Sequence, residues 1–201
     1  MFLQMTNLPN STNIFPPFHL NRLVQKCLKP FYLLLFTLSM FNSVSLKAQE
    51  LNLDKEFHKI ESYLMVMDEA NLEVSEAPVK WHLFHSLQVI NGVLKEAEHS
   101  NPDEYNSKTN FQWRFVSVFN KIPRNKVTAP DKVNPSYNIT KKQILEELKK
   151  ARKSIEGWRD LEKNNFYKHA VLMNLNKRKI RKFLRVHSRH HLKIIQDILK
   201  K

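Results

Sequence analysis

Apolar residues recur at steps of three and four from residue 53 onward, and this periodicity restricts the chain to helices that pack against one another. Because an α-helix has 3.6 residues per turn, residues spaced in this way form a single face. Four segments carry the pattern, at residues 53–67, 79–97, 144–158 and 180–198, and none contains a proline. The sequence therefore predicts an all-α fold, a four-helix bundle.

A long crossover, residues 98–139, joins the second and third predicted helices. It includes a short helical piece at about residues 111–122, followed by Pro123, Pro130 and Pro135. The third helix has a defined start, because Thr140 followed by Gln143 is the pattern of a capping box. Strand patterns are weak throughout the chain, so no sheet is expected.

The chain contains only two glycines, Gly92 and Gly157, and one cysteine, Cys27. Phosphate-binding and dinucleotide-binding loops and the GxSxG elbow need more glycine than any local stretch supplies. Cys27 falls within the first 48 residues, which leaves the rest of the chain without a thiol nucleophile, a disulfide or a cysteine-based zinc site. Histidines and carboxylates remain as candidate ligands and catalysts.

Residues 1–48 have the features of a secretory signal peptide or signal anchor. They contain no acidic residue, and a basic region precedes an apolar run at residues 30–44 and a small residue, Ala48. The run is shorter than the roughly 20 residues that a membrane span needs. We therefore expect an exported protein, periplasmic or membrane-anchored, with its folded domain at residues 49–201. Translation from a later start such as Met5 would shorten the basic region.

The chain is strongly basic, with 33 lysines and arginines against 19 acidic residues, a net charge of +14. The run KRKIRK, residues 177–182, could bind phosphate backbones or anionic lipid. Its cations lie on the polar side of the last predicted helix, where no aromatic residues interleave with them for base stacking. Specific nucleic-acid binding is therefore not expected, and association with a membrane surface is the use that fits an exported protein.

Histidines interrupt the apolar face of the last predicted helix, in the stretch LRVHSRHHLKII. His187 and His191 stand four residues apart in the middle of this face, and His190 falls on its flank. Side chains at this spacing can converge on one metal ion. A buried imidazole without partners costs about 1–3 kcal/mol, so the alternative is a pair of hydrogen-bonded core histidines.

The second predicted helix offers two further histidines, His82 and His85, and the sequence leaves the choice between them open. His85 shares a face with Trp81, Gln88 and Gly92 on a helix that is otherwise apolar almost all round. Gly92 is expected to let a neighbouring helix approach. Gln88, one turn beyond His85, could contact a ligand or substrate, but it is expected to be exposed or bonded to the backbone. The acidic residues of the first and third helices are expected on the solvent face, at Asp54, Glu56, Glu61, Glu146 and Glu147.

Several segments together resemble the DinB superfamily, including its YfiT-like metal-dependent hydrolases. They are WHLFHSL in the second helix, KIPR and AP in the crossover, and FLRVHSRHHLKIIQDIL in the last helix. The similarity covers about residues 54–199 and is strongest to a branch with an HxxHH ending. Around His169 the chain departs from the related stretch, with Ala170 and Val171 where proline and glycine are more usual, so no role is assigned to His169.

The resemblance implies a bundle whose metal ligands are His85, His187 and His191, with zinc or nickel as the divalent metal. Three neutral imidazoles would leave a position for water. This implies a metal-dependent hydrolase or group-transfer enzyme acting on an unknown small molecule. Its position on the flank makes His190 either a hydrogen-bond donor to a ligand or a proton shuttle, or else a partly exposed surface residue. The alternative is a non-catalytic metal-binding or envelope interaction protein. The oligomeric state stays open, a dimer included.

Overall fold

The computed structural model describes residues 50–124 and 135–200. The chain divides into two units, Met1–Ala48 and Gln49–Lys201, and every described residue belongs to the second. The predicted targeting segment lies outside the described residues. Among the described helices, none is long and apolar enough to cross a membrane.

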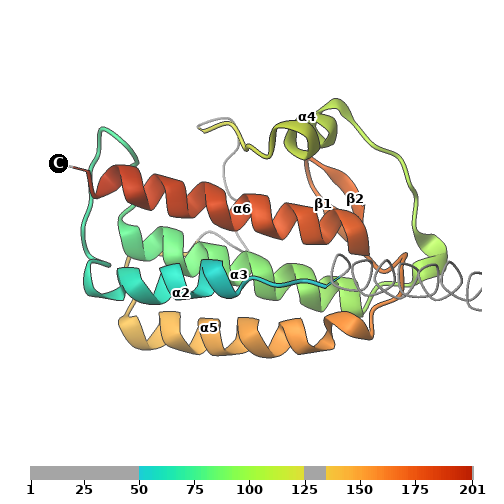
Figure 1. Ribbon diagram of the computed structural model, residues 1–201, viewed down its shortest axis with the longest axis horizontal. Coiled ribbons are helices and arrows are strands. Elements are labelled where there is room, and N and C mark those ends of the chain that lie inside the picture. The colour runs from blue at the N-terminus through green and yellow to red at the C-terminus, as the bar shows by residue number, and fades with distance from the viewer. Residues whose placement is uncertain (1–49, 125–134, 201) are drawn as a thin grey trace, which may run out of the picture. The chain divides into compact units, whose positions relative to one another are not determined.

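The described residues are mostly helical. Four helices lie side by side: α2 (Asp54–Ser62), α3 (Val79–Glu98), α5 (Lys141–Glu156) and α6 (Lys177–Ile198) (Figure 1). A short helix, α4 (Phe111–Phe119), and a two-stranded sheet of β1 (Phe166–His169) and β2 (Met173–Asn176) lie near the first half of α6. The 3-10 turns are η1 (Tyr63–Met65), η2 (Pro102–Glu104) and η4 (Gly157–Arg159).

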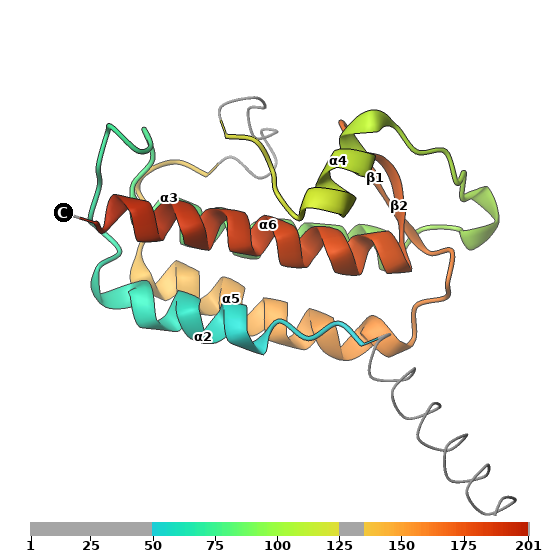
Figure 2. The same cartoon turned by 45° about the horizontal axis from the view of Figure 1, so that its top comes forward.

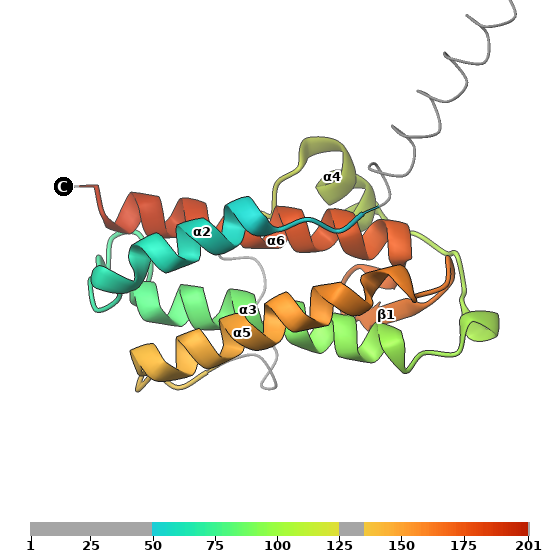
Figure 3. The same ribbon diagram turned by 60° about the horizontal axis from the view of Figure 1, so that its bottom comes forward.

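Helix α3 is the central element, because it packs against both α5 and α6 (Figure 2). Helix α2 packs against α6 on the face turned forward in Figure 3. The core is formed by the apolar faces that the sequence periodicity indicated. Its fully buried members include Phe57, Ile60, Leu83, Leu87, Ile90, Ile144, Ile180, Leu184 and Ile195.

The helix boundaries follow from local capping. The predicted capping box of α5 is confirmed, since Thr140 Oγ1 accepts from the Gln143 backbone and Gln143 Oε1 accepts from the Thr140 backbone. Asn176 caps α6 by accepting from the backbone of Lys179 at 3.2 Å. The first predicted helix is shorter than its apolar pattern, because α2 ends at Ser62 and continues as the 3-10 turn η1.

The expectation that the chain has no strands is wrong. Strands β1 and β2 form an antiparallel hairpin in which Phe166 pairs with Asn176 and His169 with Met173. The His169 Nδ1 atom accepts from the backbone N–H groups of Val171 and Leu172 at 3.0 and 3.2 Å. His169 therefore stabilises the turn, a local structural role.

The five acidic residues of α2 and α5 that were expected on the solvent face differ in how exposed they are. Asp54, Glu61 and Glu146 are exposed, and Glu147 is half-buried. Glu56 contradicts the expectation, because it is buried and its Oε1 accepts from Arg189 Nε at 2.9 Å. This ion pair joins α2 to α6 two residues before His191.

Gly92 does not let a neighbouring helix approach, contrary to the expectation from its face. The residue is exposed, and a Cβ atom placed on it would meet nothing within 4 Å. It lies inside α3, where glycine costs conformational entropy relative to alanine.

Replacing Gly92 with alanine should therefore raise the free energy of unfolding by about 0.5–1 kcal/mol. Urea unfolding followed by circular dichroism measures the change. The matched control is Ala97→Gly in the same helix, which should destabilise the protein, since Ala97 is fully buried. A Gly92→Ala protein less stable than the parent would show that a neighbour does pack on this position.

Candidate metal centre

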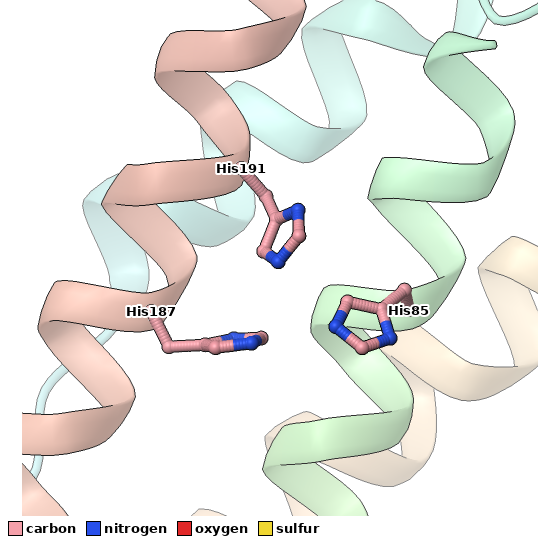
Figure 4. A group of neighbouring side chains, drawn as sticks. All are labelled: His85, His187 and His191. Atoms are coloured by element: carbon pink, nitrogen blue, oxygen red, sulfur yellow. The ribbon is translucent and has the colours of Figure 1, made fainter. Parts of the chain in front are cut away.

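Three histidines from two facing helices converge in the interior. His85 projects from α3, and His187 and His191 project from α6 into the same space (Figure 4). One ligand atom from each ring lies within 4.8 Å of the other two. His85 and His191 are only 4% and 7% exposed. The three side chains are thus close enough to bind one metal ion.

Aromatic packing fixes the three rings. The centroids of His187 and His191 are 4.6 Å apart, and those of His85 and His191 are 4.7 Å apart. Trp81, one turn before His85, stacks on its ring at 4.7 Å with an interplanar angle of 13°. The Trp81 Nε1 atom donates to the Pro135 carbonyl at 3.1 Å. A stacked indole tied to the backbone restricts how far His85 can turn.

His82 lies beside the group and not within it. Its Nδ1 is 3.0 Å from His191 Nδ1, and its Nε2 is 3.0 Å from Ser75 Oγ. Both ring nitrogens of His82 are therefore engaged, while the bond at Nδ1 of His191 leaves Nε2 of that ring for a ligand. The structure brings His85 into the group and gives His82 the position of a hydrogen-bond partner.

Three buried polar atoms have no hydrogen-bond partner among the described residues: His187 Nδ1, Gln88 Oε1 and Ser188 Oγ. Leaving a buried acceptor unsatisfied costs about 1–3 kcal/mol, and a metal ion would satisfy an imidazole lone pair. Gln88 was expected to be exposed or backbone-bonded, and its buried, unpartnered oxygen contradicts that. It lies one turn beyond His85 on α3.

His190 is half-buried on the flank of α6, as its register predicted, and is not one of the three converging residues. Its ring centroid is 5.1 Å from that of His191. Burial lowers the pKa of His190 to about 4, and the charge of Arg124 acts in the same direction. Arg124 is itself paired with Asp197 at 2.8 Å. Sequence reasoning missed Ser75 and Arg124, since no pattern links them to the histidines.

Burial also keeps the central imidazoles neutral. Desolvation lowers the pKa of His187 and of His191 well below the usual value, and neighbouring histidines add to the shift. Desolvation by burial is also the main reason that the pKa of His82 falls to about 4. Neutral imidazole is the form that binds metal, so His187 and His191 are ready as ligands at pH 7. Among the described residues, no carboxylate joins the group.

Comparisons of the chain with models of protein families, with curated proteins and with solved structures find no match. The resemblance to the DinB superfamily therefore stays a prediction from the quoted residues.

Alanine variants should separate the three converging histidines from their neighbours. His85→Ala, His187→Ala and His191→Ala should each lose stoichiometric divalent metal, because two imidazoles bind far more weakly than three. His82→Ala should retain the site but lower its affinity roughly 10- to 100-fold, since it removes the partner of His191. Metal content and zinc titration of the purified variants measure both effects.

His190→Ala is the matched control and should keep most of the metal. Loss of the metal in His190→Ala with retention in His191→Ala would contradict the assigned register. If no variant and no parent protein binds zinc, the histidines are core structure only.

Acid should destabilise the metal-free protein. The pKa of His82 and of His190 is about 4 in the folded protein and near 6.5 in the unfolded chain. Between pH 6.5 and 4, the unfolded chain therefore binds protons at these two residues that the folded protein does not bind. The free energy of unfolding should fall as the pH is lowered from 6.5 to 4, by about 1 kcal/mol or more per pH unit. Urea unfolding across this range tests this. His82→Gln should flatten the slope, and stability independent of pH would contradict the prediction.

Proposed function

We propose that this chain is a DinB-like four-helix bundle, exported by its first 48 residues, that binds a divalent metal for hydrolysis or group transfer on a small molecule. The observation that supports the proposal is the convergence of three histidines, His85, His187 and His191, from facing helices. Donor sets of imidazole nitrogens suit zinc and nickel, which we propose as the metals.

The donor set fits such an ion in number and in protonation state. Three imidazoles leave one position open, as in catalytic zinc sites. A bound zinc ion would supply an activated water molecule and polarise a carbonyl or phosphoryl oxygen of a substrate. The orphaned Nδ1 atom of His187 supports a ligand in this space, because nothing else in the described residues satisfies it.

The protein's own groups position the ligands. With His191 binding through Nε2, its Nδ1–H donates to His82 Nδ1, and His82 Nε2–H donates to Ser75 Oγ. This chain of bonds fixes the tautomer of His191 and holds its ring in orientation. Gln88 Oε1 is a free acceptor for a donor group on a substrate. His190, neutral and half-buried beside His191, is the group we assign to proton transfer.

The rival is a non-catalytic metal-binding or envelope interaction protein. It is favoured by the lack of any carboxylate in the histidine group among the described residues, since a hydrolase commonly uses one as a base. A non-catalytic site would be closed by a fourth protein ligand. The two roles therefore differ in whether an outside molecule can reach the metal.

The test is azide binding to the cobalt-substituted protein. An open position should let azide change the visible cobalt spectrum in a saturable manner. His190→Ala should give the same response, because His190 is not a ligand. Two outcomes would contradict the catalytic proposal. In the first, azide alters the cobalt spectrum of His190→Ala but not that of the parent protein, which would show that His190 closes the site. In the second, azide alters the spectrum of neither protein.

A further inference from the structure

Helix α4 is apolar on two opposite sides, although it has only nine residues. Trp113 and Val116 are buried at 8% and 4% exposure. Phe111, Val118 and Phe119 are 77%, 69% and 59% exposed. One apolar side packs on the domain, and the other faces solvent. Of the eight large hydrophobic residues exposed in the described part of the chain, these three lie on one short helix.

The exposed side is held in place and does not belong to a loosely attached segment. Asn110 caps the helix by accepting from the Trp113 backbone at 2.9 Å, and its amide donates to the carbonyl of Val171 in the hairpin turn. Asn120 ends the helix in the left-handed region, with φ of 51°. The rings of Phe115 and Phe119 pack at 4.9 Å. The orientation of the exposed face is thus fixed by both helix ends.

The surroundings of this face are cationic. The sequence has no aspartate or glutamate from Tyr105 to Pro130. Lys108, Arg114 and Lys121 are exposed there, and within the described residues none of them forms an ion pair. Exposed aromatic side chains among unpaired cations match the composition of helices that lie in the interface of an anionic bilayer.

We propose that the exposed face of α4, formed by Phe111, Phe115, Val118 and Phe119, docks on a membrane surface that carries anionic lipid. The phenyl rings enter the boundary between headgroups and acyl chains, and Lys108, Arg114 and Lys121 attract the lipid phosphates. Both parts are needed, because apolar burial supplies binding and charge selects anionic lipid.

A second copy of the chain fits this face less well. In a two-fold dimer the same patch meets itself. Lys108, Arg114 and Lys121 would then approach their own counterparts with no acidic residue of the patch between them, and juxtaposed like charges oppose association. The proposal is independent of the metal, since none of these residues belongs to the histidine group. It also places membrane contact on α4, and not on the basic run of α6.

The test uses the full chain with a single probe on α4. Val118→Cys, made together with Cys27→Ser, carries an environment-sensitive fluorophore. Vesicles of equal parts phosphatidylcholine and phosphatidylglycerol should shift its emission to the blue, and vesicles of phosphatidylcholine alone should not. The combined variant Arg114→Glu and Lys121→Glu should raise the lipid concentration for half-maximal shift by about tenfold or more. Because the probe reports on α4 alone, attachment through residues 30–44 does not mimic the result.

Leu72→Cys is the matched control, a 78% exposed residue in the segment between η1 and α3, at the other end of the domain from α4 (Figure 1). Its probe should not respond to either vesicle. Three results would overturn the proposal: no response at position 118, an equal response to both vesicle types, or a shift that depends on protein concentration without lipid. The last would show that a second copy covers this face.

Discussion

The packing of α3 against α6 is the contact on which the candidate site depends. It buries the apolar faces of both helices and, in the same interface, brings His85 opposite His187 and His191. Imidazoles in such an interface are tolerated only when their nitrogens find partners. His191 finds one in His82, whereas Nδ1 of His187 has none among the described residues. The part of the chain that the structure describes therefore leaves polar atoms of these two helices unsatisfied, Nδ1 of His187 among them.

Features set by one helix could be predicted from the sequence. The capping box at Thr140 and the i, i+4 relation of His187 and His191 depend only on helix geometry. The choice between His82 and His85 could not be made this way, because it depends on the rotation of α3 relative to α6. Tertiary bonds also decide the hairpin: Ser100 Oγ accepts from the Phe166 backbone, and Asn165 donates to the Ala97 carbonyl. Strands of four residues carry too little pattern to predict alone.

The buried Glu56 illustrates a second limit of sequence reasoning. The residue belongs to a charged stretch that reads as a solvent-facing surface, yet Arg189 reaches across from α6 to pair with it. Its partner lies 133 positions away along the chain, and no local sequence pattern predicts an ion pair at that separation. The same holds for Ser75, which stands in an irregular segment and becomes relevant only through the ring of His82.

The candidate ligands differ greatly in their separation along the chain, and this has a consequence for folding. His187 and His191 are four residues apart, whereas His85 stands 102 positions before His187. An unfolded chain therefore already carries a nearby pair of imidazoles that can hold an ion weakly. Metal that binds the unfolded chain stabilises the fold less than its affinity for the native protein suggests. If the three histidines bind a metal ion, the stability that the ion adds would come mainly from His85, which joins the other two only when α3 docks on α6.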